Sequence, residues 1–139
     1  MYVSDDAINC VLNMKPMIIA PIPRSEEIRL ADLHLYDLLD TEAEPAFDEL
    51  RELAAQICNC PISLITLLDK DRQWFKSKQG VDESETARDV SFCSHAILDD
   101  EVMVVEDATQ DDRFFDNPFV EGEMNIRFYA GAPIVSPTG

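Results

Sequence analysis

The sequence predicts an α+β domain, in which an antiparallel sheet carries helices packed on one face. Helical patterns come first, over residues 25–39 and 45–58, and a strand–turn–strand pattern follows over residues 62–78. Long polar connections, rather than helices, separate the later strands. Because a parallel sheet requires strands and helices to alternate, this order favours antiparallel pairing.

Length and composition indicate one soluble domain. The 139 residues suit a single core, and a hydrophobic content of 46% is enough to drive folding. The 28 acidic residues outnumber the 11 basic ones and give a net charge of −17, which opposes binding to nucleic acid or anionic lipid. No stretch reaches the ~18–20 apolar residues of a membrane span, so we expect a cytoplasmic protein without membrane insertion.

Residues 1–24 are predicted to be a leader or linker, and residues 25–139 to form the domain. Prolines punctuate the end of the leader, and Ser25 then suits a helix N-cap. A broad apolar face continues to the end of the predicted first helix at residue 39. It is formed by Ile28, Leu30, Leu33, Leu35, Leu38 and Leu39.

A second helix is predicted from Pro45 to about Cys58. Proline suits the first helical turn, because the N–H group that it lacks would have no partner there. Apolar residues recur at three- and four-residue steps and form a stripe that we expect to face a core. The stripe consists of Phe47, Leu50, Leu53, Ala54 and Ile57.

The first strands are predicted as a hairpin. Ile62–Leu68 is short and rich in β-branched and aliphatic residues, and Gln73–Lys78 can return as its partner. Gly80–Asp89 is polar and predicts a surface loop. The pattern of Val90–Leu98 fits either a strand or a short helix.

Two further strands are predicted, at Val102–Glu106 and Ile126–Val135. A polar excursion over Asp107–Asn117 lies between them, and Ser136–Gly139 forms a turn after the second.

The four cysteines do not indicate a metal site. Cys10, Cys58, Cys60 and Cys93 include no CxxC pair, and neither histidine lies near a second group of ligands in the sequence. We therefore expect reduced, partly buried thiols and no bound metal.

Nine short motifs together carry a family resemblance. They are Leu38–Thr41, Phe47–Leu50, Pro61–Leu64, Asp71–Ser77, Val90–Ile97, Asp107-Ala108, Asp112–Phe114, Asp116–Pro118 and Ile126–Pro133. In number and order they resemble the GAF domains at the front of bacterial sensor histidine kinases and diguanylate cyclases. The resemblance covers about residues 26–139.

The resemblance implies a twisted antiparallel sheet and a pocket in which some members hold a nucleotide, a tetrapyrrole or another small molecule. It also implies a homodimer and a kinase or cyclase output domain outside these residues. Relatives continue with one more strand and a closing helix, so we expect the domain to be C-terminally incomplete. A gap should then separate Ile62–Leu68 from Ile126–Val135, unless Met17–Ile22 or a neighbouring molecule fills it.

A thiol, a hydroxyl and an imidazole crowd together in Phe92-Cys93-Ser94-His95. Catalysis would need a residue that orients the imidazole, and the sequence identifies none. Ser94 separates Cys93 from His95, which disfavours the covalent bilin attachment of tetrapyrrole-binding relatives. In another GAF group, which reduces free methionine sulfoxide, one cysteine falls roughly at Cys93, but no partner thiol is evident here.

Candidate ligand contacts are Trp74, Phe92, Cys93, His95, Arg127 and Tyr129. Arg127 interrupts an apolar strand and must reach solvent, hold an anionic ligand or pair with an acid, for which Asp107 and Asp112 are the candidates. Tyr129 suits either core packing or ligand contact.

These observations favour a signal-transduction module, of the kind used in two-component systems, that binds a small ligand or a partner and regulates an output domain. We do not expect the domain itself to be an enzyme, and its cofactor, if any, is unknown. One alternative is a cysteine-dependent redox enzyme resembling free methionine sulfoxide reductase, which requires a second thiol close to Cys93. The other is a structural dimerisation domain without a ligand. Ligand binding predicts a pocket bordered by Phe92, His95, Arg127 or Tyr129.

Overall fold

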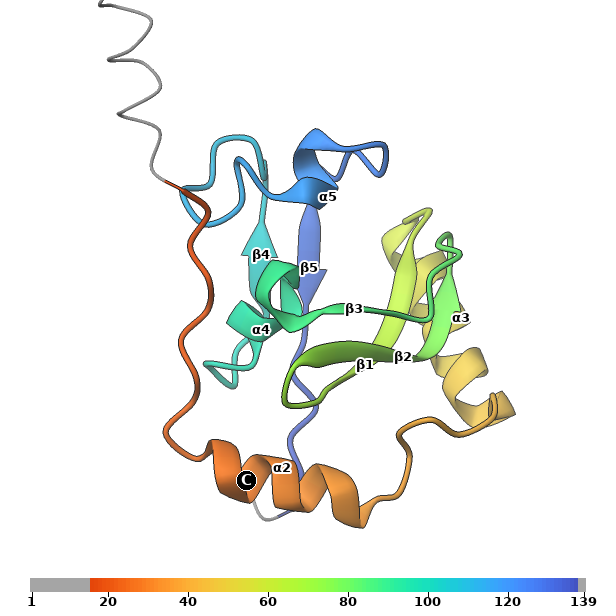
Figure 1. Cartoon of the computed structure of the whole chain (residues 1–139). Coiled ribbons are helices and arrows are strands. Elements are labelled where there is room, and N and C mark those ends of the chain that lie inside the picture. Colours follow the sequence, from red (N-terminus) through yellow and green to blue (C-terminus); the bar gives the residue numbers. More distant parts are fainter. Residues whose placement is uncertain (1–15, 138–139) are drawn as a thin grey trace, which may run out of the picture.

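A computed structural model describes residues 16–137, and Cys10 lies outside them. Helices and small antiparallel sheets make up the chain, which confirms the mixed α+β class (Figure 1). The predicted hairpin is present, because β1 (Ser63–Leu68) pairs antiparallel with β2 (Arg72–Gln79). A short third strand, β3 (Glu85–Ala87), continues this sheet beyond β2. It lies inside the segment that we predicted to be a loop.

A second sheet is separate from the first. It contains β4 (Met103–Val105) and β5 (Tyr129–Gly131), so only three residues of the predicted strand 126–135 are in a ladder. Within the described residues β5 pairs with β4 alone and β1 with β2 alone, which leaves two sheets where a single one was predicted. Met17–Ile22 forms no strand and therefore does not join them.

The first helix, α2 (Glu26–Leu35), ends earlier than predicted. Asp37 and Asp40 have left-handed φ angles of 51° and 59°, and the chain turns there instead of continuing the helix to residue 39. Ser25 makes no side-chain capping bond, and no residue of α2 is buried. The apolar face of this helix is therefore not a core face.

The second helix, α3 (Pro45–Cys58), has the predicted bounds. Pro45 lies in its first turn, and Asn59 adopts a left-handed conformation just after its end. At 14 residues it is the longest helix among residues 16–137, and no helix in this range is long and apolar enough to cross a membrane.

The predicted core-facing stripe of α3 is wrong. Leu50, Leu53 and Ile57 are 55%, 52% and 73% exposed. Arg51 instead donates to the hydroxyl of Ser77 on β2 at 3.0 Å, and the buried Ala55 follows one turn later on the same face. The face of α3 that lies against the sheet is therefore the one that carries Arg51, and hydrophobic periodicity does not indicate this face.

Short helices fill the second half of the chain. Val90–Leu98, whose pattern fitted either a strand or a short helix, contains the short helix α4 (Cys93–Ala96). The 3₁₀ turn η1 (Arg88–Val90) leads into it. A further helix, α5 (Pro118–Glu121), was not predicted. Its signal was nevertheless in the sequence, because Asn117 caps it by accepting a bond from the Phe119 amide at 2.8 Å and Pro118 occupies its first turn.

The main hydrophobic core lies beside the second sheet, between α4 and α5. It consists of Phe92, Val105, Ala108, Phe114 and Val120, each at most 4% exposed. Partly buried side chains, Tyr129 among them, pack against it. The core therefore lies directly beside the motif that begins α4.

Candidate functional site

The thiol of Cys93 meets polar side chains from both sheets. Thr66 on β1 donates its hydroxyl to the sulfur at 3.6 Å, and Gln73 on β2 donates its amide at 3.5 Å. The hydroxyl of Tyr129 on β5 lies 3.3 Å from the same sulfur. We call these four residues the Cys93 cluster. A single sulfur atom at the start of α4 thus links the two sheets.

Local hydrogen bonds hold the short helix that carries Cys93. The hydroxyl of Ser91 accepts the Ser94 amide at 3.0 Å, and the Ser94 hydroxyl donates to the carbonyls of Ser91 and Arg88. Ser94 is 3% exposed. The serine that separates Cys93 from His95 therefore has a structural role in fixing this turn.

A group of aromatic rings packs beside Tyr129 of the cluster. Phe92 stacks on Phe114 with ring centroids 4.0 Å apart, and it lies 5.1 Å from the ring of Tyr129. His95 meets Phe114 edge-on at 4.9 Å. Four of the six candidate ligand residues, namely Phe92, Cys93, His95 and Tyr129, are brought together in this way.

Burial changes the acid–base behaviour of two of these residues. Burial, together with the adjacent Cys93, raises the pKa of Tyr129, and the protonated phenol can donate to the sulfur. Burial lowers the pKa of His95 below 6.5 despite its bond to the Ile18 carbonyl, and Arg113 acts in the same direction. A neutral imidazole then donates from Nε2 to the Ile18 oxygen at 2.9 Å.

The other two candidates lie elsewhere. Trp74 follows Gln73 on β2 and is half-buried opposite Leu67 in the ladder with β1. Arg127 is exposed, and its guanidinium donates to the carbonyls of Val120, at 2.9 Å, and of Ile126, and to the side chain of Asn125.

No ion pair joins Arg127 to Asp107 or Asp112 in the part of the chain that the structure describes. Asp107 instead accepts from the amide and hydroxyl of Thr109, and these bonds, with a smaller contribution from the positive charge of Arg127, lower its pKa. The guanidinium of Arg127 is thus satisfied by carbonyl and amide oxygens, so the predicted pairing with either acid is not formed here.

Comparison with known proteins places the chain in a family. Residues 42–139 match the GAF domain. The chain belongs to the GAF domain family. It is also 45% identical, over 123 residues, to a cyclic di-GMP phosphodiesterase from Pseudomonas aeruginosa. That match covers 88% of this chain and 21% of the relative, so the chain spans about a fifth of the relative's length.

Sequence reasoning missed two members of the Cys93 cluster in this GAF domain. Gln73 is 5% exposed and lies two residues before the buried Phe75, so alternation along this first part of β2 was the available signal. Thr66 lies at the irregularity in the β1–β2 register between Ile65 and Thr66, which periodicity does not reveal.

Two surface hollows of the GAF domain lie along α2. The larger, of about 340 Å³, is lined by residues 22–28, and the other, of about 260 Å³, by Asp32, Leu35, Tyr36 and Pro137. None of the six candidate ligand residues borders either hollow. The predicted pocket next to Phe92 and Tyr129 is therefore not one of these two.

The surroundings of Cys93 can be compared with those of a metal site or a redox thiol pair. The described residues contain no group of three or more His, Cys, Asp or Glu side chains arranged to hold a metal ion. Cys58, Cys60 and Cys93 are free thiols, and the hydrogen-bonding partners of the Cys93 sulfur are two hydroxyls and an amide. Nothing in this geometry favours the redox alternative.

Proposed function

We propose that this GAF domain is a regulatory sensory module whose sensing site is the Cys93 cluster, and that it controls an output domain which makes or degrades cyclic di-GMP. One observation carries the choice of site: a single sulfur contacts side chains from both sheets. Family membership supports a signalling role, and the Pseudomonas relative supports this kind of output domain over a histidine kinase.

The physical basis is the position of Cys93 between two separate sheets. A ligand or partner that displaces one contact of the sulfur changes the packing of β1, β2 and β5 together, because each contributes one side chain to it. Such a ligand shifts the equilibrium between two arrangements only by its difference in affinity for them.

A chimera tests this proposal. The aligned segment of the Pseudomonas phosphodiesterase is replaced by this chain, and hydrolysis of cyclic di-GMP is measured with the Tyr129→Phe variant. This change removes the hydroxyl next to Cys93 and keeps the ring that packs on Phe92. Tyr36→Phe is the matched control, because Tyr36 is 54% exposed.

We expect Tyr129→Phe to change the hydrolysis rate by roughly fivefold or more, the lower range of coupling between distinct sites. Tyr36→Phe should leave it unchanged. Equal rates for both variants in an active chimera would refute a regulatory role of the cluster. Native mass spectrometry of the freshly purified chain complements this test, since a retained small molecule adds a defined mass. Tyr129→Phe should lower the fraction of protein molecules that carry this added mass.

A further inference from the structure

Residues 16–35 form one continuous segment on the outside of the domain. An extended strap, residues 16–23, runs past α4 and β4 and leads directly into α2 (Figure 1). The Glu26 amide donates to the Pro23 carbonyl at 3.1 Å and closes the turn between them. We call this segment the N-terminal arm and the remaining described residues the body.

Polar contacts attach the strap to the body. The Met17 amide donates to Asp116 at 2.8 Å, and the Asn117 side-chain amide donates to the Met17 sulfur at 3.2 Å. His95 donates to the Ile18 carbonyl, as described above. Side chains of the body therefore bind mainly the backbone of the strap, while Ile18 is 48% exposed.

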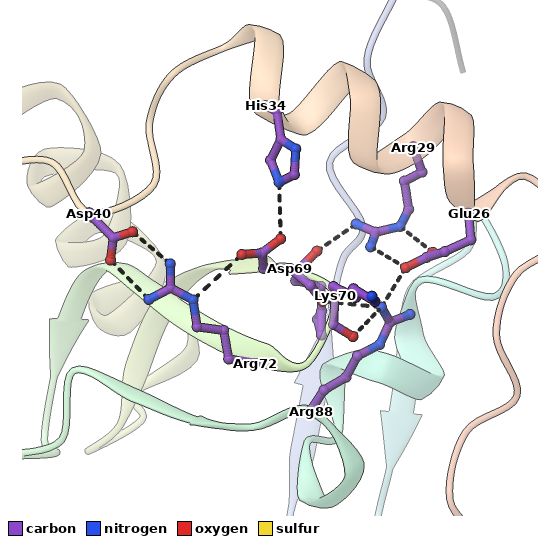
Figure 2. A network of polar contacts seen from close by, with 9 residues as sticks. Glu26, Arg29, His34, Asp40, Asp69, Lys70, Arg72 and Arg88 are labelled. Atoms are coloured by element: carbon purple, nitrogen blue, oxygen red, sulfur yellow. Dashed lines mark hydrogen bonds and ion pairs between the residues drawn. The ribbon is translucent and has the colours of Figure 1, made fainter.

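Polar contacts also attach α2 (Figure 2). Arg29 donates to the Leu68 carbonyl at the end of β1 at 2.8 Å, and His34 bonds to Asp69 at 3.0 Å. Glu26 lies between two guanidinium groups, those of Arg29 on its own helix and Arg88 on the body. Figure 2 shows these contacts in a row along one side of α2.

Two guanidinium groups dominate the electrostatic environment of Glu26. Burial raises its pKa, but hydrogen bonds and charges from Arg29 and Arg88 outweigh burial and hold the pKa at about 2. Its side chain is 13% exposed and that of Arg88 is 6% exposed, so this pair is screened less than a surface pair. Of the ion pairs between the arm and the body, it is the most buried.

Hydrophobic burial contributes little to the attachment. No residue of α2 is buried, and the main core contains no residue of the arm. Leu30 and Leu33 are half-buried, whereas Ile28 and Leu35 are 64% and 82% exposed. Segments with few buried apolar contacts occupy the low-stability end of a structure and open without global unfolding.

We propose that the N-terminal arm detaches from the body and rejoins it as one unit, with the Glu26–Arg88 pair as its main latch. Arg88 keeps acceptors on the body when the arm leaves, because the carbonyls of Asp69 and Lys70 lie 3.1 and 3.3 Å from its guanidinium. The contact from His95 to Ile18 places the strap beside the Cys93 cluster. The inference concerns the arm alone and holds whether or not the cluster binds a ligand.

Amide hydrogen exchange of the full chain, followed by mass spectrometry, tests the latch. Glu26→Ala removes the latch, and Glu27→Ala makes the same change at the neighbouring exposed position. We expect Glu26→Ala to accelerate exchange in residues 16–35 about tenfold or more, the factor that corresponds to 1.4 kcal/mol, while residues 63–79 of the hairpin keep their rates. Glu27→Ala should change neither region.

A second variant tests whether the arm moves as a unit. Asp116→Ala removes the acceptor of the Met17 amide at the far end of the strap, and Asp112→Ala is the exposed control. Detachment as a unit predicts faster exchange in residues 26–35, which Asp116 does not contact. Acceleration confined to the strap, or equal acceleration of arm and hairpin in either variant, overturns the proposal. Unchanged exchange in Glu26→Ala overturns it as well.

Discussion

The aromatic core and the N-terminal arm show two ways of holding a segment in one small domain. In the core, Phe114 is 1% exposed and stacks on Phe92. In the arm, Leu35 is 82% exposed, and the named contacts with the body are hydrogen bonds and ion pairs. Both segments are rich in apolar residues, so the difference shows that composition does not decide which of them is buried.

A third region, around Lys76, holds a charged side chain that is buried. Lys76 on β2 is 3% exposed and donates to Thr41, to the Glu42 carbonyl and to Glu44, at 2.6–2.8 Å. Its ammonium also lies 5.3 Å from the ring of Phe47. This junction is as polar as those of the arm, but its ammonium donor is buried, so we expect it to contribute more to stability than an exposed contact does.

The largest effect is expected in the core. Phe114→Ala should lower the free energy of unfolding by about 3–5 kcal/mol, because it removes a buried ring and leaves a cavity. Phe128→Ala, at a position that is 54% exposed, should have a much smaller effect. Urea denaturation followed by tryptophan fluorescence measures both. Similar losses for the two variants would contradict the assignment of the core.

A smaller effect is expected at the buried ammonium of Lys76. Lys76→Met should lower the free energy of unfolding by about 1–3 kcal/mol, because the acceptors of the Thr41–Glu44 segment lose their donor. Lys70→Met is the control, since Lys70 is exposed. If Lys76→Met were as stable as this control in the same urea titration, polar junctions in this domain would contribute little even when buried.

The smallest effect is expected where the arm meets the core, at His95. Its pKa is lowered by burial, so below pH 6.5 the unfolded chain binds a proton that the folded chain resists. Stability from this group is thus complete above pH 6.5 and declines as the pH falls below it. His95→Gln should make the loss of stability between pH 7 and pH 5 shallower than in the wild type. Parallel curves in thermal melts would show that His95 titrates normally.

Local chemistry made several elements predictable. Pro45 and the residues before Pro61 delimit α3, because proline is tolerated in a first turn and excluded from a helix interior. The polar turn after Leu68 delimits the hairpin, because β-branched and aliphatic runs on both sides of turn residues favour antiparallel pairing. These signals act over a few residues, so the sequence displays them directly.

Contacts between distant segments limited the other predictions. The α3 stripe was predicted to be buried, but Arg51 faces the sheet instead, and its partner Ser77 lies 26 residues further along the chain, on β2. Thr66 and Gln73 could not be identified as partners of Cys93, since three elements must first be assembled around the sulfur. Arg127 was expected to form an ion pair with a carboxylate, but its guanidinium instead donates to backbone carbonyls in its own neighbourhood.

By itself, the sequence determined the α+β class, the bounds of α3, the β1–β2 hairpin and the motifs that resemble the GAF family. Only the tertiary structure decided that the strands form two sheets, that Cys93 lies between them and that α2 is attached by polar contacts. The physical reason is the range of the interactions. Periodicity, caps and turns depend on neighbours in the chain, whereas burial and side-chain pairing depend on what folding brings from far along it.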